Sequence, residues 1–316
     1  MKNFDIVYIG TSLVDVIVQG FDKKPISASG YRAESCSINV GGEAVNGVIT
    51  AAKLGAKTSI LCHLGGDDEG DMVVRALEKY GVDTSNIVRD EHPTPVTTML
   101  VDADGSRKSI TNLAHKHNFH PERYLDCLKG AKAVVLGSLF RAPFDDPAIV
   151  KAVVEFAHEN SILVFADTKI PNFAKITLDD LNGSLSYIDY ITPNEDEGRF
   201  FTGEDDPEKM ADVLLEKGVK NVIVKLGAKG CLFKNKQRTI CLPAYDINAV
   251  DTTGAGDNLL AAFACEVLGG RDYQEALEFA NACGAICSTA VGASTALKNR
   301  QQVETFLRSS RNDINS

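Results

Sequence analysis

The stretch Asp251-Thr252-Thr253-Gly254-Ala255-Gly256-Asp257 is followed directly by a mostly apolar run, 258–268, and then by a glycine pair. Apolar side chains recur every four positions in that run, which predicts a helix that ends at the glycines. Gly254, Ala255 and Gly256 would then lie where a loop becomes a helix. At such a place unpaired backbone N–H groups and the positive end of the helix dipole favour an anion, and glycine lets the backbone approach a phosphate closely.

Asp257 falls in the first turn of this expected helix, so its carboxylate would face whatever anion the amides bind. A phosphate cradle with a base beside it is the arrangement that phosphoryl transfer to a hydroxyl needs. Taken alone, however, the same residues also fit an ordinary helix start with an acid in its first turn. The rest of the chain has to decide between the two.

The composition is that of a globular protein with an ample core, since 44% of the 316 residues are hydrophobic and 24% are charged. This length predicts one domain, residues 1–316. The formal net charge of -10 provides no overall basic field, so nucleic acid is not an expected partner. A local basic site for a small anion is compatible with this charge.

The chain contains no apolar run long enough to span a bilayer, and its start lacks the pattern of a secretory signal. The eight cysteines show no C-x-x-C spacing, and scattered cysteines of this kind suit a reducing compartment. We therefore expect a cytoplasmic protein with no membrane partner.

Apolar and amphipathic segments alternate along most of the chain, which indicates an α/β fold with a parallel-rich central sheet and helices on both faces. Residues 11–35 show no clear pattern, and 309–316 are polar and expected to fray. The expected strands are 4–9, 57–64, 133–136, 162–166, 190–192 and 221–224, and the expected helices are 43–54, 68–80, 147–159, 207–217 and 258–268. Ligands of such sheets bind beyond the carboxyl ends of the strands. That rule points to residues 10–15, Asp167, 194–197 and 225–230.

A second, smaller sheet is expected outside this alternation. Residues 96–101 and 106–111 flank a polar turn with a glycine, which predicts a β-hairpin. The short alternating strand 36–40 could pair with it. The small sheet would then be formed by about 36–40 and 95–112.

The stretch 251–257 resembles the C-terminal signature of the ribokinase-like (PfkB) carbohydrate kinases, and four further features match that family in chain order. They are Gly10 with Asp15 after the first strand, Gly41-Gly42 with Asn46, Thr192-Pro193-Asn194-Glu195-x-Glu197, and Lys225-x-Gly227-x-x-Gly230. Together they cover nearly the full chain. The resemblance implies a ribokinase-like fold whose small sheet is a lid that covers a sugar and can serve as a homodimer surface.

The resemblance also implies an ATP-dependent transfer to a hydroxyl, most simply a hydroxymethyl, of a sugar or similar small molecule. Asp257 resembles the base that takes the proton of the acceptor hydroxyl. The amides of Gly254, Ala255 and Gly256 resemble the anion hole for the transferred phosphoryl group.

The family uses magnesium, around which Asn194 and Glu197 act largely through water. These two residues are three positions apart, so they would share one face of a helix. The same residues are also typical of a capped helix start. Some relatives also hold potassium, and Asp251 and Thr253 with the late loop 290–294 correspond to that site.

On the nucleotide side, Lys225, Gly227 and Gly230 belong to a strand–turn–strand that borders the nucleotide in the family. It is not a P-loop, which needs a helix after the lysine. Asn281 falls where family members line the adenine pocket. The competing explanations are a solvent-exposed lysine and a helix-surface amide.

On the sugar side, Asp15 can accept hydrogen bonds from two hydroxyls, although alone it is equally a surface acid in a turn. Gly41 and Gly42 would let the sugar approach the backbone, and Asn46 faces the same site one helical turn later. His115, His117 and His120 follow the hairpin and are interpreted as a polar loop rather than as metal ligands.

Several departures from the family pattern leave the acceptor open, namely Glu43, Leu139, the segment 167–169, and Asn258 directly after the base. A nucleoside kinase of the same family is one alternative, and a catalytically silent sugar or nucleotide sensor is another. A dinucleotide dehydrogenase is disfavoured because no Gly-x-Gly-x-x-Gly follows the first strand.

Overall fold

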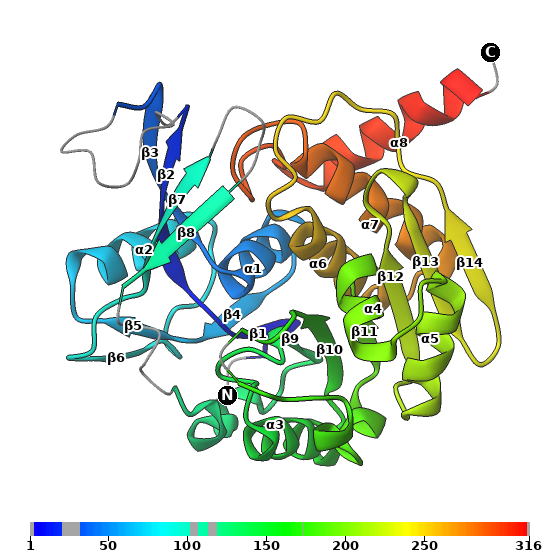
Figure 1. The fold of residues 1–316 in the computed structure, drawn as a ribbon, viewed down its shortest axis with the longest axis horizontal. Helices are drawn as coiled ribbons and strands as arrows, with labels where there is room; N and C mark the ends of the chain where they lie inside the picture. Colours follow the sequence, from blue (N-terminus) through cyan, green and yellow to red (C-terminus); the bar gives the residue numbers. More distant parts are fainter. Residues whose placement is uncertain (1–2, 21–31, 102–106, 113–118, 173, 315–316) are drawn as a thin grey trace.

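The computed structural model describes residues 3–20, 32–101, 107–112, 119–172 and 174–314, and it is built around one eight-stranded sheet (Figure 1). The strand order is β14-β13-β12-β11-β10-β9-β1-β4. The strands are β1 (Ile6–Ile9), β4 (Thr58–Leu61), β9 (Ala133–Leu139), β10 (Leu163–Thr168), β11 (Tyr190–Thr192), β12 (Asn221–Lys225), β13 (Cys231–Asn235) and β14 (Thr239–Leu242). From β4 to β12 every pairing is parallel, whereas the pairings of β13 with β12 and with β14 are antiparallel. The predicted parallel-rich sheet is therefore confirmed.

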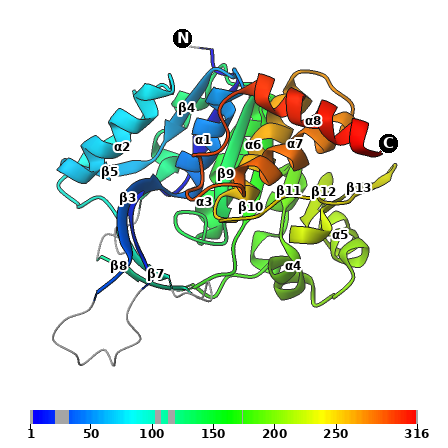
Figure 2. The same ribbon diagram turned by 90° about the horizontal axis from the view of Figure 1, so that it is seen from above.

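Helices cover both faces of this sheet (Figure 2). They are α1 (Glu43–Lys53), α2 (Asp68–Lys79), α3 (Pro147–Glu159), α4 (Glu195–Thr202), α5 (Pro207–Glu216), α6 (Ala255–Leu268), α7 (Tyr273–Cys287) and α8 (Arg300–Ile314). Single-turn 3-10 helices occur at Pro121–Arg123, Leu125–Leu128, Asp179–Leu181, Ser184–Tyr187 and Gly227–Lys229. Side chains of β1 alternate between two cores, with Ile6 and Tyr8 on the α1, α6 and α7 side and Val7 and Ile9 on the α3 and α5 side. Within the described part of the chain, none of the helices is both long enough and apolar enough to cross a bilayer.

The smaller sheet stands beside the main one and contains four strands rather than three. Its order is β3 (Ser35–Gly41), β2 (Leu13–Gln19), β7 (Val96–Val101) and β8 (Arg107–Thr111). The hairpin of β7 and β8 confirms the predicted pairing, while its turn, 102–106, lies outside the described residues.

The prediction of an irregular segment over 11–35 is wrong for its first half, because residues 13–19 form β2. The expected pairing of 36–40 with the hairpin is also wrong, because β2 lies between β3 and β7 and pairs with both. Asp15 interrupts an otherwise β-branched and apolar run, which hides the strand in the sequence.

Two further sequence expectations need correction. The strand expected over 57–64 is split, because β4 ends at Leu61 and β5 (His63–Gly65) leaves the main sheet to pair with β6 (Val88–Asp90). The polar end expected to fray instead continues α8 as far as Ile314.

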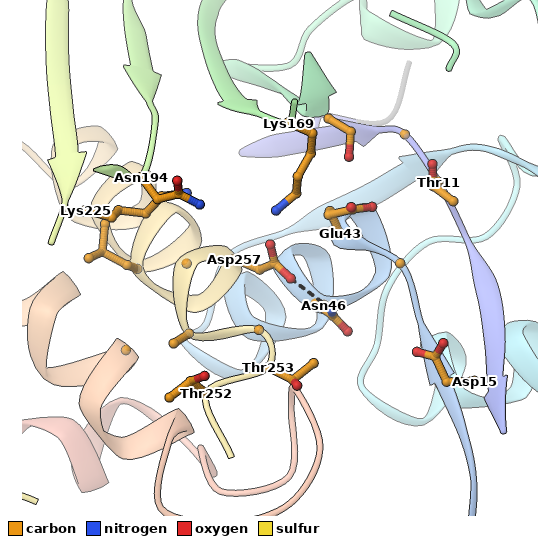
Figure 3. A pocket seen from close by; sticks show the side chains of 18 of the residues that line it. Thr11, Asp15, Glu43, Asn46, Lys169, Asn194, Lys225, Thr252, Thr253 and Asp257 are labelled. Atoms are coloured by element: carbon orange, nitrogen blue, oxygen red, sulfur yellow. Dashed lines mark hydrogen bonds between the residues drawn. The ribbon is translucent and has the colours of Figure 1, made fainter. Parts of the chain in front are cut away.

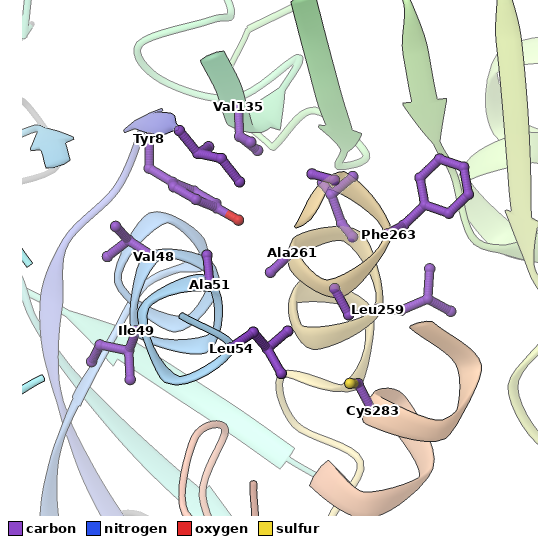
Figure 4. Packing of buried hydrophobic residues seen from close by; sticks show 14 of the residues in the cluster. Tyr8, Val48, Ile49, Ala51, Leu54, Val135, Leu259, Ala261, Phe263 and Cys283 are labelled. Carbon is purple, nitrogen blue, oxygen red and sulfur yellow. The ribbon is translucent and has the colours of Figure 1, made fainter. Parts of the chain in front are cut away.

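Close packing between β1, α1 and α6 sets the position of the two helices that bear the candidate site (Figure 4). Tyr8 of β1 is only 2% exposed, and Val48 and Phe263 are fully buried in the same cluster. Gly47 lies in the middle of α1 against the Tyr8 ring, and a Cβ added there would lie 2.4 Å from Tyr8 Cε1. The absence of a side chain at this position allows α1 to lie against the tyrosine.

We expect Gly47→Ala to lower the free energy of unfolding by about 1–3 kcal/mol, because the added methyl group overpacks against the buried ring. The effect has the opposite sign to helix propensity, which favours alanine over glycine by up to about 1 kcal/mol. Urea unfolding followed by circular dichroism measures it. Gly198→Ala in α4 is the comparison variant, because its Cβ would lie 2.6 Å from Met210 Sδ, near the end of a flexible side chain that can shift more easily than the Tyr8 ring. A Gly47→Ala protein as stable as the wild type would contradict the close packing.

Candidate active site

A cleft of about 1610 Å³ opens between the carboxyl ends of the parallel strands and the small sheet. Residues from β9 and β12 and from the segments that follow β1, β10 and β11 line one wall, and residues of β2, β7 and β8 line the other. Most candidate residues line it: Asp15, Gly42, Asn46, Asn194, Lys225, Gly227, Gly230, Thr253, Gly254, Ala255, Gly256, Asp257 and Asn281. Gly41, Glu197 and Asp251 do not line it and lie behind this surface.

The turn before α6 requires glycine. Gly254 has a left-handed φ of 78°, and a Cβ there would lie 2.4 Å from the Cβ of Ala293. The helix begins at Ala255, three residues earlier than the apolar pattern suggests. The Ala255 N–H already donates to Thr252 O at 3.2 Å, whereas the amides of Gly254 and Gly256 make no hydrogen bond with another described residue. Two amides at this helix start are therefore available to an anion.

Asp257 lies in the first turn of α6 and is 8% exposed (Figure 3). Its Oδ2 accepts a hydrogen bond of 2.8 Å from Asn46 Nδ2 of α1. Burial raises the pKa of this carboxyl to about 6, with Glu43 and Asp167 adding to the rise and Lys169 and Asn46 opposing it. Such a group is ionised at neutral pH, yet it is basic enough to accept a proton.

Asn258, which departs from the family pattern, has a structural role beside Asp257. It is fully buried, and its Nδ2 donates to Gly254 O and to Ala293 O, each at 2.8 Å. Its Oδ1 accepts a hydrogen bond of 3.0 Å from Thr50 Oγ1 of α1. One amide thus holds together α1, the glycine turn and the late loop.

Asp15 extends from β2 into the opposite wall of the cleft (Figure 3). Burial, and secondarily the charge of Glu43, raises the pKa of this carboxyl to about 6. A Cβ at Gly41 would lie 2.1 Å from Asp15 Oδ2, so this glycine makes room for the carboxylate. Gly42 has a φ of 96° and faces Thr11 O so closely that a Cβ would lie 2.3 Å away. Both glycines are explained by close packing.

The strand–turn–strand at Lys225 is confirmed, and its lysine is not solvent-exposed. The Lys225 side chain is 12% exposed, and its Nζ lies 2.5 Å from Asp167 Oδ1. A Cβ at Gly256 would lie 3.1 Å from the same Nζ, which places the ammonium against the start of α6. Gly227 and Gly230 line the cleft beside it.

Asn281 is a buried residue of α7 and not a helix-surface amide, since it is 8% exposed. Its Nδ2 donates to Pro243 O at 2.8 Å. The segment that follows Pro243 lines the cleft through Ala244, Tyr245, Asp246, Ile247 and Ala249. Asn281 therefore anchors the loop that closes this end of the cleft.

Asn194 and Glu197 form a capping box at the start of α4. The Glu197 N–H donates to Asn194 Oδ1, and the Asn194 N–H donates to Glu197 Oε2, each at 2.9 Å. Thr168 Oγ1 donates to the same Glu197 oxygen at 2.9 Å. The capped helix start is thus present. It does not exclude a role in metal binding, because Asn194 lines the cleft and the buried Asp167 Oδ2 nearby has no hydrogen-bond partner.

The loop that contains Asp251 and Thr253 and the late loop 290–294, which the resemblance assigns to a potassium site, are joined by hydrogen bonds. Asp251 Oδ1 accepts from the N–H and the hydroxyl of Thr253, and Asp251 Oδ2 accepts from the Gly292 N–H at 3.0 Å. Leu139, noted as a departure, is fully buried in the core and does not line the cleft, whereas Ser138 and Arg141 do. His120 contacts Glu122 at 3.0 Å, and His115 and His117 lie outside the described residues.

Lys169 and His63 line the cleft but were not among the sequence candidates. Lys169 follows β10, two residues beyond Asp167, whose position at a strand end was the available signal. His63 is buried, and its Nε2 lies 2.8 Å from Asp90 Oδ1. No sequence pattern indicated His63, because β5 was expected to continue β4.

Comparison with known proteins agrees with this geometry. The family model described as pfkB family carbohydrate kinase matches residues 3–300. The chain is 30% identical over 279 residues to a ribokinase of Haemophilus influenzae, which covers 87% of this chain and 89% of that protein. A structure of Arabidopsis thaliana ribokinase complexed with ribose and ATP has a TM-score of 0.84 at 25% identity, with 97% of this chain and 99% of that chain covered.

The structure of a putative ribokinase II from E. coli in complex with ATP and Mg²⁺ has a TM-score of 0.79 at 26% identity. The match covers 97% of this chain and 99% of that chain. The ribokinase-like resemblance seen in the sequence is confirmed. The chain belongs to the pfkB family of carbohydrate kinases.

Proposed function

We propose that this family member transfers the γ-phosphoryl group of ATP to a hydroxyl, most simply a hydroxymethyl, of a sugar or related polyol. The observation that carries the proposal is the Asn46–Asp257 pair, which places an ionised, buried carboxylate beside the free amides at the start of α6. Asp257 would take the proton of the acceptor hydroxyl as its oxygen attacks the γ-phosphorus. The amides of residues 254–256 would stabilise the charge on the transferred group, with those of Gly254 and Gly256 available at once and that of Ala255 shared with Thr252 O.

The lid wall of the cleft supports an acceptor rich in hydroxyl groups. Asp15 offers two carboxylate oxygens there, and Thr97, Ser109 and Thr111 add hydroxyls from β7 and β8. Enclosure of the acceptor by this sheet would exclude water, which otherwise competes as the phosphoryl acceptor. Ile38 and Ile110 on the lid are 59% and 65% exposed, which supports the proposal that the lid also forms a homodimer surface.

ATP and magnesium are the cofactors of this proposal, as in the two solved relatives whose complexes contain ATP, one of them with Mg²⁺. Asn194 and Glu197, with Asp167 Oδ2 beside them, provide the hard oxygen donors that magnesium prefers. When bound, the ion would neutralise phosphate charge. Lys225, Gly227, Gly230 and Asn281 would border the nucleotide. Asp251 and Thr253 with the loop 290–294 would hold a potassium ion.

A nucleoside is the second acceptor class to consider, because Met99 and Phe119 line the cleft and could support a base. The two classes are separated by a coupled ADP-release assay over pentoses, deoxypentoses, hexoses, sugar acids and nucleosides. We expect turnover with at least one free sugar. Turnover with nucleosides alone would replace the proposal with a nucleoside kinase, and sugar binding without any turnover would indicate a sensor.

We expect Asp257→Asn to lower kcat by about 10³-fold with the fastest acceptor, since general-base catalysis supplies about 10²–10⁴-fold. Binding of MgATP, measured by calorimetric titration, should stay within a fewfold of the wild type because the amides and Lys225 are unchanged. Asp126→Asn is the control, since that carboxylate is 84% exposed and lies outside the cleft. Wild-type turnover by Asp257→Asn would remove the base assignment.

The pH profile of kcat/KM should fall on the acid side of about pH 6. The pKa values of Asp257 and Asp15 are both raised to about 6, so acidification below that pH protonates the base and the sugar-binding carboxylate together. On the acid side of the profile, kcat/KM should therefore fall by more than tenfold per pH unit. In the Asp15→Asn variant, kcat/KM should fall by close to tenfold per pH unit, because one titrating carboxyl remains. A profile that is flat down to pH 4.5 would contradict both assignments.

A further inference from the structure

Lys169 occupies the middle of the cleft, between the expected nucleotide and sugar sides (Figure 3). It directly follows β10, and its N–H donates to Leu139 O at 3.0 Å, which fixes the backbone where the side chain begins. The side chain is 26% exposed, and it points toward Asp257 and Glu43. Sheet and cleft together hold this ammonium beside the expected reaction centre.

The ammonium of Lys169 is surrounded by carboxylates without being bound tightly to any of them. Its Nζ lies 3.6 Å from Asp167 Oδ2 and 3.9 Å from Glu197 Oε1, which are ion-pair distances longer than a hydrogen bond. Among the described residues it makes no direct hydrogen bond. The Lys169 ammonium is therefore a cation whose three donors are available to a ligand.

Lys225 provides a useful contrast, because it contacts the same carboxylate from the other side. Its Nζ lies 2.5 Å from Asp167 Oδ1, so one of its donors is already engaged, and its side chain is only 12% exposed. It lies against Gly256 at the anion hole. Lys169 instead faces the base. Two lysines therefore flank the position where a phosphoryl group between ATP and the acceptor hydroxyl would pass.

We propose that Lys169 is a catalytic residue whose ammonium donates hydrogen bonds to the oxygens of the phosphoryl group during its transfer. In this step the acceptor oxygen forms a bond to the γ-phosphorus, the bond to the β–γ bridging oxygen breaks, and ADP leaves with that electron pair. The acceptor proton goes to Asp257. The lysine keeps its protons throughout and offsets the charge that spreads over the equatorial oxygens. This inference rests on the proposed kinase function.

The test compares Lys169→Met, Lys169→Gln and Lys169→Arg in steady-state assays with the fastest sugar acceptor. The two neutral variants should lower kcat by about 10²–10³-fold, as expected when a donor to a transition-state oxyanion is removed. Lys169→Arg keeps the charge and should recover at least about tenfold of that loss. The Kd of MgATP should change by less than about tenfold, because the lysine acts mainly on the moving group.

A second readout separates catalysis from a merely structural role. Removal of the positive charge should move the acid limb of the kcat/KM profile to higher pH, because Lys169 lowers the pKa of Asp257. A loss of packing alone would lower activity without this shift. Lys175→Met is the matched control, since Lys175 is an exposed lysine of the same segment and does not line the cleft. Lys169→Gln provides the test if Lys169→Met does not fold, since it retains a polar side chain between the two carboxylates.

Wild-type kcat in a folded neutral variant would overturn the catalytic role of Lys169. So would a loss confined to MgATP affinity, which would make it a ground-state binding residue. Asp257→Asn is measured in parallel to separate this inference from the proposed function. If Asp257→Asn is inactive and Lys169→Gln is fully active, only the lysine assignment fails. If Asp257→Asn is fully active, the kinase mechanism itself fails.

Discussion

The hydrogen bond from the Asn46 amide to the Asp257 carboxylate joins α1 to α6, and the geometry of the cleft depends on how these two helices pack. A second bond, from Thr50 to Asn258, ties the same helices one turn further along α1. Gly47 lets α1 lie directly on Tyr8, so the helix pair is set against the central sheet as well. Because β3 ends at Gly41 and α1 begins at Glu43, the same packing also fixes where the small sheet joins the rest of the molecule.

In the cleft, positively charged side chains lie beside buried carboxylates. Buried carboxylates of Asp167, Glu197 and Asp257 would each be unfavourable if isolated, since an ionised group away from water needs compensation. Lys169 and Lys225 supply part of it from strand ends. Part of the negative charge that these carboxylates place beside the cleft is thereby neutralised locally.

Residue patterns predicted the main sheet because its parallel strands are buried on both faces and are mostly apolar. Glycines at 42 and 254 were informative because their backbone conformation is one that other residues rarely adopt. Strand β2 of the small sheet was missed because Asp15 breaks its apolar pattern, and Asp15 is the residue of this strand that lines the cleft together with Leu13. Lys169 was missed because Asp167 lies in β10 and Glu197 follows β11, and only the pairing of these two strands brings both carboxylates to the lysine. Sequence therefore predicts the residues at strand ends better than the charge network they form.

The buried carboxyl of Asp257 also has a thermodynamic consequence for the fold. Its pKa rises from 3.8 to about 6 on folding, so the folded state binds this proton more tightly than the unfolded chain does. The contribution of this group to stability is therefore most favourable at acid pH and is lost as the pH rises from about 4 through about 6. Above pH 6, a pKa shift of this size lowers the contribution of Asp257 to the free energy of unfolding by about 3 kcal/mol relative to acid pH. The ionised state required of a base is thus a state that the fold resists, and the tightly packed aromatic and aliphatic side chains between α1, α6 and the sheet supply the cohesion that maintains it.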